Sequence, residues 1–470
     1  MSYQLIFSTY LFTLAFLPAI LLCYTLLLRR GQPRAARWAL VLASLCFFAY
    51  GAGDFFPVFI VSVFFNYGLA RALGTLRAQR REPSARALLV LGVVVNLALL
   101  GFYKYTDFIL GNVNVFRETP LPLQHILLPV GISFYTFQII GYTVDSWRGE
   151  TRDYSLLSYL LFVTFFPHLI VGPIVHHTDI VPQYESLSTN TQTSENIALG
   201  VFLFAIGCSK KIMLADPLTR WAQAAFNNTA VLSTLDAWGA SLGYTLSYYF
   251  DLSGYADMAV GLGLLFGIHF PVNFNSPYKA RNFAEYWNRW HITLSRFLGD
   301  YVFRSVLRKG AGSANFYWAV FVTFLVSGIW HGAGWTFVVW GVLNGLFVIA
   351  SHMMKRNELA LPLPVAWALT FVGAIAVRVL FVSRTFQDAW NVYVRSIDFA
   401  SLSLSSNQFI GPRQGVYLLV GLGIVLLLPN STEFRQRFRP NLTYALATSA
   451  LLVMSFMNMS AVKGFLYFQF

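Results

Sequence analysis

Charged side chains are scarce in this sequence. Asp, Glu, Lys and Arg together make up 11% of its 470 residues, whereas an ordinary soluble domain carries roughly 25%. This shortage excludes the charged surface of a typical soluble enzyme. Disorder is excluded too, because disordered chains are poor in apolar residues and hydrophobic residues account for 56% of this chain.

The hydrophobic residues gather in long runs that define the fold class. About thirteen runs can be traced, from residues 5–28 to residues 442–459. A membrane-spanning helix needs about 20 apolar residues, and the first run lacks the basic flank and cleavage site of a signal peptide. The sequence therefore predicts an all-α polytopic membrane protein with about 11–13 hydrophobic segments, some of them re-entrant or interfacial.

Further absences bear on the kind of site. No internal repeat or soluble segment divides the chain, so residues 1–470 are expected to form a single integral-membrane domain. Three cysteines make neither a disulfide framework nor a thiol–metal motif. His168, His176 and His177 lie close together but lack a matched second set of ligands, so no metal site is predicted. The net charge of +13 resides in short loops, which favours the lipid bilayer over nucleic acid as the partner.

Basic loops predict an orientation. They contain Arg29, Arg30, Arg34 and Arg37 after the first run, and Arg71, Arg77, Arg80, Arg81 and Arg86 after the third. The turn near Asp54 has no Lys or Arg. Because cytoplasmic loops are enriched in Lys and Arg, both basic loops are expected in the cytoplasm and both chain termini outside it.

One polar stretch, residues 283–301, has the pattern of an amphipathic helix. Its aromatic and aliphatic residues share one face: Phe283, Trp287, Trp290, Leu294 and Leu298. The opposite face carries two i,i+4 ion pairs, Glu285 with Arg289 and Arg296 with Asp300. This pattern predicts a helix that lies flat at the membrane interface.

His331 is the sharpest candidate for chemistry. It lies between two apolar runs and is followed by Gly332 and Gly334, and an ionisable residue at membrane depth marks function by default. A neutral imidazole there can accept a proton from a hydroxyl group. The alternative is a histidine that only packs, hydrogen-bonded to a helix carbonyl.

Three other residues are weaker candidates on their own. His291 follows Trp290 and can serve either as a site residue or as an anchor at the headgroup level. Asp251 and Tyr255, four residues apart, can share one helix face as substrate ligands. Their spacing alone favours the alternative, polar contacts between membrane helices.

Several motifs in order resemble the membrane-bound O-acyltransferase family, in its bacterial branch that includes the alginate O-acetyltransferase membrane subunit. The motifs that carry the resemblance are Leu128–Phe137, Phe165–Pro173, Tyr249–Asp257, Asn273–Tyr278, Trp287–Ser295 and Gly328–Ala333. Three positions depart from the alginate-type pattern, namely Asn288, His176 and the shortened basic segment Arg308–Ser313.

The resemblance implies a helical ring around a funnel and places the family's catalytic histidine on His331 and its second histidine on His291. Residues expected to contact substrate are Trp287, Asn288, Trp290, Trp330, Asp251 and Tyr255. The expected reaction is transfer of an acyl group, most often acetyl, from acetyl-CoA in the cytoplasm to an extracytoplasmic glycan, directly or through a periplasmic acyltransferase partner. No bound cofactor is expected, and the location is the bacterial cytoplasmic membrane.

Alternatives remain open at this level. The acceptor can instead be peptidoglycan, cellulose or teichoic acid. A polytopic transporter of acyl groups or glycans is a rival from another class, although transporters typically carry repeats and charges along several spans. A noncatalytic scaffold would leave the two histidines unexplained.

Overall fold

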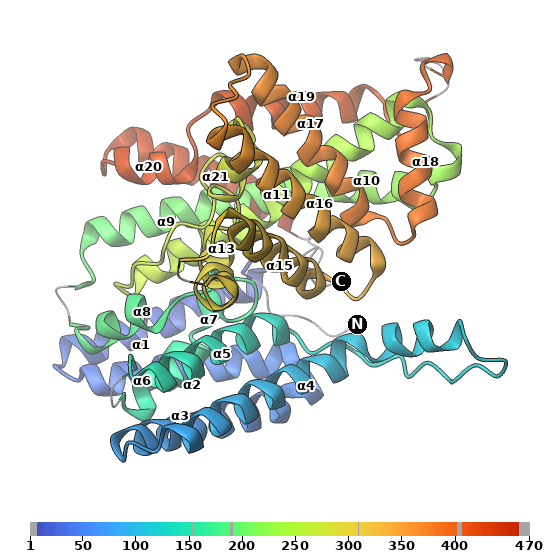
Figure 1. Cartoon of the computed structure of the whole chain (residues 1–470). Helices are drawn as coiled ribbons and strands as arrows, with labels where there is room; N and C mark the ends of the chain where they lie inside the picture. Colours follow the sequence, from blue (N-terminus) through green and yellow to red (C-terminus); the bar gives the residue numbers. More distant parts are fainter. Residues whose placement is uncertain (1–6, 152–153, 189–190, 309, 402–406, 460–470) are drawn as a thin grey trace. The chain divides into compact units, whose positions relative to one another are not determined.

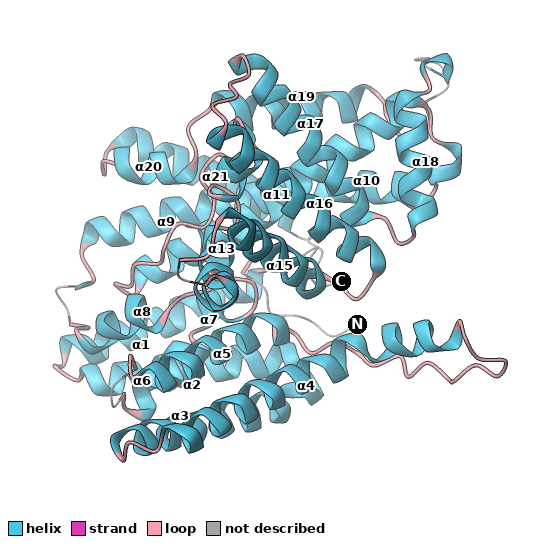
Figure 2. Ribbon diagram, in the orientation of Figure 1, coloured by secondary structure: helices cyan, strands magenta, loops and turns pink. Residues whose placement is uncertain are grey.

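The computed structural model describes residues 7–151, 154–188, 191–308, 310–401 and 407–459. These residues form helices joined by loops, and no strand occurs among them (Figure 2). The chain divides into two compact units. Unit 1 comprises residues 1–205, 257–271 and 440–448, and unit 2 comprises residues 206–256, 272–439 and 449–470.

Unit 1 is built from the N-terminal helices. Their bounds are η1 Leu11–Phe16, α1 Leu17–Arg29, α2 Pro33–Ala52, η2 Gly53–Phe55, α3 Phe56–Ala78, α4 Glu82–Asn114, α5 Ile132–Arg148, α6 Leu156–Thr164, α7 Phe166–Leu169, α8 His177–Glu185 and α9 Ser194–Ser209. Helices α3 and α4 run side by side (Figure 1). Asn66 on α3 and Asn96 on α4 exchange two amide hydrogen bonds of 3.0 and 2.7 Å, which link the two apolar helices in a medium without competing water.

Unit 2 contains most of the remaining helices. Their bounds are η4 Lys210–Ala215, α10 Asp216–Phe226, η5 Thr229–Val231, α11 Thr234–Leu265, η6 Pro277–Lys279, α12 Phe283–Trp287, α13 Ile292–Leu298, η7 Gly299–Phe303, α14 Arg304–Val306, α15 Ser313–His331, α16 Trp335–Arg356, α17 Leu363–Val382, α18 Phe386–Ile397, η8 Phe399–Ser401, α19 Pro412–Leu427, α20 Ser431–Arg437 and α21 Leu442–Asn458. The chain passes between the two units five times, within α9, α11 and α21 and in the loops at residues 271–272 and 439–440.

Seven helical segments of the described chain are long and apolar enough to cross a membrane, or eight if the bent pair α19 and α20 counts as one span. One of the seven, Pro33–Ala78, is 46 residues long and contains both α2 and α3. The all-α, polytopic class is therefore confirmed. The predicted 11–13 hydrophobic segments were expected to include re-entrant or interfacial ones, and seven or eight described segments are long enough to span. Several apolar runs fold instead into shorter helices, such as α6 with 9 residues and α5 with 17.

Helices α15 and α16 pack closely through glycine. A Cβ on Gly328 of α15 would lie 2.5 Å from the carbonyl oxygen of Phe337, and one on Gly341 of α16 would lie 2.6 Å from that of Phe324. Small residues allow membrane helices to approach to this distance. The pair forms a hairpin, and His331 lies at its turn.

The prediction of one continuous helix over residues 283–301 is wrong. The segment consists of α12, a break at residues 288–291, α13 and the π-helical turn η7. The break occurs at His291, whose φ of +46° no continuous right-handed helix accommodates. The aromatic residues Phe283, Trp287 and Trp290 are buried within unit 2 and not left open to lipid, whereas the ion pairs Glu285–Arg289 and Arg296–Asp300 form on the more exposed side at 2.8 and 3.9 Å.

Candidate active site

His331 is the last residue of α15 and is 4% exposed. Gly332 and Gly334, both in extended conformation, lead directly into α16. A Cβ on Gly332 would lie 2.1 to 2.5 Å from ring atoms of Phe337. Glycine at this position therefore lets the Phe337 ring cover the turn and shield the backbone beside His331.

Aromatic rings surround the His331 imidazole. Its centroid lies 4.9 Å from that of Trp330, 5.0 Å from Trp340 and 5.4 Å from Phe381, each in an edge-to-face arrangement. Rings in this geometry fix the imidazole plane and displace water. The predicted catalytic histidine and Trp330, one of the predicted substrate contacts, are thus neighbours in space as well as in sequence.

His291 occupies a strained position at the start of α13. It is one of few non-glycine residues in the left-handed region, where such strain persists only when the surroundings enforce it. Hydrogen bonds to Asn273 hold this conformation. The Asn273 backbone carbonyl accepts a hydrogen bond from the Ile292 amide at 2.9 Å. Its side-chain oxygen accepts hydrogen bonds from the Thr293 amide at 3.2 Å and from the Thr293 hydroxyl at 2.9 Å.

The electrostatic state of His291 follows from its burial. The residue is 3% exposed, and desolvation lowers the pKa of its imidazole to about 4. At neutral pH the ring is therefore uncharged. Its Nδ1 is buried and has no hydrogen-bond partner in another residue of the described part of the chain.

A stack of rings lies beside His291. Trp290 stacks on Tyr248 of α11, with centroids 5.8 Å apart and planes within 11°, and on Tyr286 of α12, at 5.7 Å and 12°. Trp290 and His291 are adjacent in the chain, so the stack fixes the backbone that carries the histidine.

Arg378 on α17 joins this stack to the surroundings of His331. Its guanidinium carbon lies 4.3 Å from the centre of the Tyr248 ring and 5.0 Å from the centres of both Trp290 and Phe381. Phe381 is the ring that also contacts His331. Arg378 is buried and forms no ion pair with any described residue. Its charge is stabilised by these three π-faces together with side-chain hydrogen bonds to Tyr248 and Tyr286.

Sequence reasoning missed Arg378. The available signal was a lone arginine inside the apolar run 362–383, which is the kind of residue that marks function or a buried partner in a membrane helix. The aromatic partners that stabilise it come from α11, the residues before α13 and α17, and their convergence is not visible in the linear sequence.

The remaining predicted substrate contacts differ in their distance from the rings around His331. Trp287 lies close to the His331 surroundings: its ring centroid is 5.7 Å from that of Trp340, and its indole nitrogen donates to Asn344 Oδ1 at 3.2 Å. Asn288 is exposed at the C-terminal end of α12 and is not brought into these ring contacts.

Asp251 belongs to a buried ion cluster. The ammonium group of Lys211, in the π-helical turn η4, lies 2.6 Å from Asp251 Oδ1 and 2.9 Å from Asp216 Oδ1. A buried charge pair of this kind must be complete, because removing one partner leaves an uncompensated charge. Tyr255 is buried one turn further along α11. The arrangement makes Asp251 a partner of Lys211 in the fold.

In unit 1, His177 has a carboxylate on one side and a phenol on the other. Its Nε2 lies 3.3 Å from Asp145 Oδ2, and its Nδ1 lies 3.2 Å from the Tyr154 hydroxyl. Asp145, Glu150 and His177 bring possible ligand atoms within 4.8 Å of one another, but Arg148 also lies 3.3 Å from Asp145, and this cation competes with a metal ion. His168 is fully buried, and desolvation lowers the pKa of its imidazole to about 3.

The chain belongs to the membrane-bound O-acyltransferase family, MBOAT, whose model matches residues 124–378. It is 35% identical over its whole length to a peptidoglycan O-acetyltransferase of Helicobacter pylori, 98% of which is covered. It is 38% identical over 85% of its length to a probable alginate O-acetylase AlgI of Pseudomonas aeruginosa, 76% of which is covered. A teichoic acid D-alanyltransferase of Streptococcus thermophilus is 27% identical over 50% of the chain, with 59% of that protein covered.

Membership confirms the family resemblance, the helical membrane class and the enzyme class. The protein is a multi-pass membrane O-acyltransferase. The matched range contains both His291 and His331 and ends at Arg378, so the three residues that the ring contacts connect all lie within the family domain.

Proposed function

We propose that this protein transfers an acetyl group from acetyl-CoA in the cytoplasm to hydroxyl groups of a polysaccharide outside the bacterial cytoplasmic membrane, either directly or through a partner protein that relays the acetyl group. The observation that carries the proposal is the enclosure of His331 by Trp330, Trp340 and Phe381 at a helix turn. Names of relatives support the acetyl group and a glycan acceptor.

His331 acts as the general base. Its imidazole takes the proton of the acceptor hydroxyl while the hydroxyl oxygen attacks the carbonyl carbon of the thioester. The tetrahedral intermediate then collapses, the carbon–sulfur bond breaks, and the leaving thiolate receives the proton from the imidazolium. Proton transfer by a positioned side chain contributes typically about 10² to 10⁴ in rate.

His291 binds and orients a reactant. A neutral imidazole suits a hydrogen bond to a hydroxyl or carbonyl group. A pKa of about 4 leaves His291 a poor proton acceptor at neutral pH, which suits a role in binding.

The orientation of the reaction rests on the basic loops. With the loops containing Arg34 and Arg80 in the cytoplasm, acetyl-CoA remains on the side where it is made. Neither the polar donor nor the polymer then has to cross the bilayer, because only the acetyl group passes between them.

His331→Gln is the direct test, since Gln forms hydrogen bonds but cannot take up a proton at neutral pH. The matched control is His352→Gln on α16, because His352 also packs edge-on against a ring, that of Phe316 at 5.1 Å. We expect loss of acetyl groups from the polymer in the first variant and retention in the second, at equal amounts of protein in the membrane. Normal acetylation by His331→Gln would remove His331 from the chemistry.

The acceptor is tested separately by measuring ester-linked acetate in purified peptidoglycan and in secreted polysaccharide from strains with and without the gene. Loss from one polymer alone identifies the acceptor. A strain that lacks the gene and keeps acetate in both polymers would contradict the proposed glycan acceptor.

A further inference from the structure

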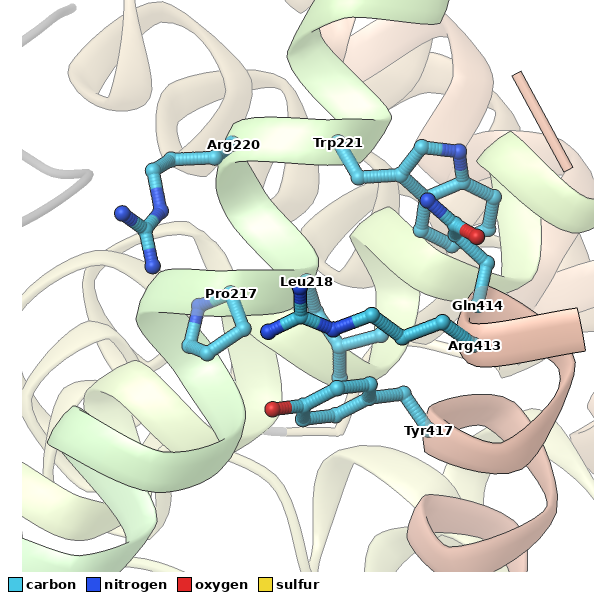
Figure 3. A pocket seen from close by; sticks show the side chains of 7 residues that line it. All are labelled: Pro217, Leu218, Arg220, Trp221, Arg413, Gln414 and Tyr417. Carbon is cyan, nitrogen blue, oxygen red and sulfur yellow. The ribbon is translucent and has the colours of Figure 1, made fainter. Parts of the chain in front are cut away.

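A pocket of about 420 Å³ lies in unit 2 between α10 and the first turns of α19 (Figure 3). None of the rings that contact His331 line it. Arg220 and Trp221 of α10 and Arg413 and Tyr417 of α19 line it. Figure 3 shows Arg413 extending from α19 toward α10 alongside the Tyr417 ring.

The charges in this pocket are all of one sign. Its lining residues include two guanidinium groups and no carboxylate. Neither Arg220 nor Arg413 has an ion-pair partner in the described ranges of the chain. Two cations around one cavity favour an anion there, and guanidinium groups bind carboxylates with two parallel hydrogen bonds.

The α10 wall of the pocket is fixed by the glycines of α11. A Cβ on Gly243 would lie 2.4 Å from the Trp221 ring, so only glycine admits the indole against α11. Trp221 Nε1 is buried and lacks a hydrogen-bond partner among the residues that the structure describes. The indole is therefore fixed in position, and its N–H group has no acceptor among the described residues.

The α19 wall is fixed by Asp236. Its carboxylate accepts three backbone hydrogen bonds from the residues just before α19: from Gln408 at 3.0 Å, Phe409 at 3.0 Å and Ile410 at 2.8 Å. Charge-assisted bonds of this kind are about twice as strong as neutral ones. Arg413 thus projects from a helix start that is anchored to α11.

We propose that this pocket binds an acidic saccharide unit of the acceptor polymer. The guanidinium groups of Arg220 and Arg413 pair with a sugar carboxylate, and the rings of Trp221 and Tyr417 contact the apolar C–H face of the sugar ring. The acceptor is thereby held at a place distinct from the reacting hydroxyl. The assignment of the ligand as an acceptor rests on the proposed function.

The test measures binding directly. Purified protein in nanodiscs of neutral phosphatidylcholine is titrated with an oligosaccharide of uronic acids, and with its carboxyl-reduced counterpart as the uncharged control. We expect the acidic oligosaccharide to bind and the reduced one to bind at least tenfold more weakly. The double variant Arg220→Gln/Arg413→Gln should lose at least tenfold in affinity for the acidic form.

Control variants distinguish loss of binding at this pocket from loss of acetyl transfer. Arg384→Gln removes an exposed arginine that does not line the pocket and should leave binding unchanged. His331→Gln should abolish transfer but retain binding, so loss of the proposed function does not imitate loss of this site. The double variant Arg220→Lys/Arg413→Lys keeps both positive charges. It should therefore bind the acidic oligosaccharide more tightly than the Arg220→Gln/Arg413→Gln variant does.

Three results would overturn the proposal. Equal binding of the acidic and reduced oligosaccharides would show that charge is not recognised. Unchanged affinity in the double variant would place the ligand elsewhere. Displacement of the oligosaccharide when phosphatidylglycerol is added to the nanodisc, with no other change, would reassign the pocket to a lipid headgroup.

Discussion

The imidazole of His331 lies edge-on against the indole of Trp340, with ring centroids 5.0 Å apart and planes at 86°. Trp340 also contacts Trp287, so one indole connects the turn that carries the proposed base with the segment that precedes His291. Changes at Trp340 should therefore affect the position of the imidazole before they affect its chemistry.

Trp340→Phe should preserve the edge-to-face contact and reduce transfer less than tenfold. Trp340→Ala should reduce transfer much further, because removing a buried indole costs about 3–5 kcal/mol and frees the imidazole to rotate. The measurement is acetyl incorporation per molecule of membrane-inserted protein, together with the thermal unfolding midpoint in detergent. Equal activity of the Phe and Ala variants would argue against a positioning role for this ring.

Arg378→Met should lower transfer by roughly tenfold or more, because a desolvated cation over aromatic faces contributes about 2 kcal/mol and its loss loosens Trp290 and Phe381 together. Arg378→Lys keeps the charge and should recover part of the rate. Michaelis constants and turnover numbers measured on purified protein separate poor binding from poor positioning. If the Met variant worked at the wild-type rate, Arg378 would contribute packing alone.

Acidification should destabilise the protein through His291. The folded-state pKa of about 4 lies below the unfolded value of about 6.5, so above pH 7 the ring is neutral in both states and adds no pH dependence. As the pH falls from 6.5 toward 4, the unfolded chain gains a proton that the folded chain does not bind, and the free energy of unfolding drops by roughly 1–3 kcal/mol.

This effect is measured as the unfolding midpoint at pH 7.5 and pH 5 in wild type and in His291→Asn. The Asn variant lacks the titrating group and should show a smaller decrease. His168 contributes in the same direction, so the difference between the two proteins, and not the slope of either, isolates His291. A parallel decrease in both proteins would contradict the assignment.

Gly328→Ala should reduce the amount of folded protein, since the new methyl group would meet the Phe337 carbonyl at 2.5 Å and overpacking costs about 1–3 kcal/mol. The matched control is Gly423→Ala on α19, where nothing lies within 4 Å of the added Cβ. Quantitative immunoblotting of membranes gives the comparison. Equal abundance of the two variants would mean that α15 and α16 separate without cost.

Much of the molecule could be predicted from the sequence, because hydrophobic runs and glycine spacing are local signals. The apolar runs around His331 predicted membrane helices, and α15 and α16 are such helices. The prediction of one helix over residues 283–301 failed for a physical reason. Asn273, ten residues before the segment, forms the hydrogen bonds that hold His291 in a left-handed conformation. The periodicity of the segment does not reveal these hydrogen bonds.

The candidate site was predictable only in part. His331, Trp330 and Trp287 could be named from motifs, and all three lie in connected ring contacts. Arg378 and Tyr248 could not, since α17 and α11 are 130 residues apart at these positions and only the fold brings them together. Asp251 was a candidate for substrate, but its contact with Lys211 required knowing that η4 faces α11.

The left-handed backbone of His291 limits which substitutions can test the role of its side chain. An alanine at a φ of +46° would suffer a steric penalty unrelated to the lost imidazole, and an inactive His291→Ala variant would confound misfolding with missing chemistry. Asparagine tolerates this conformation far better than alanine and keeps a hydrogen-bonding side chain. His291→Asn is therefore the substitution whose loss of activity can be attributed to the ring alone.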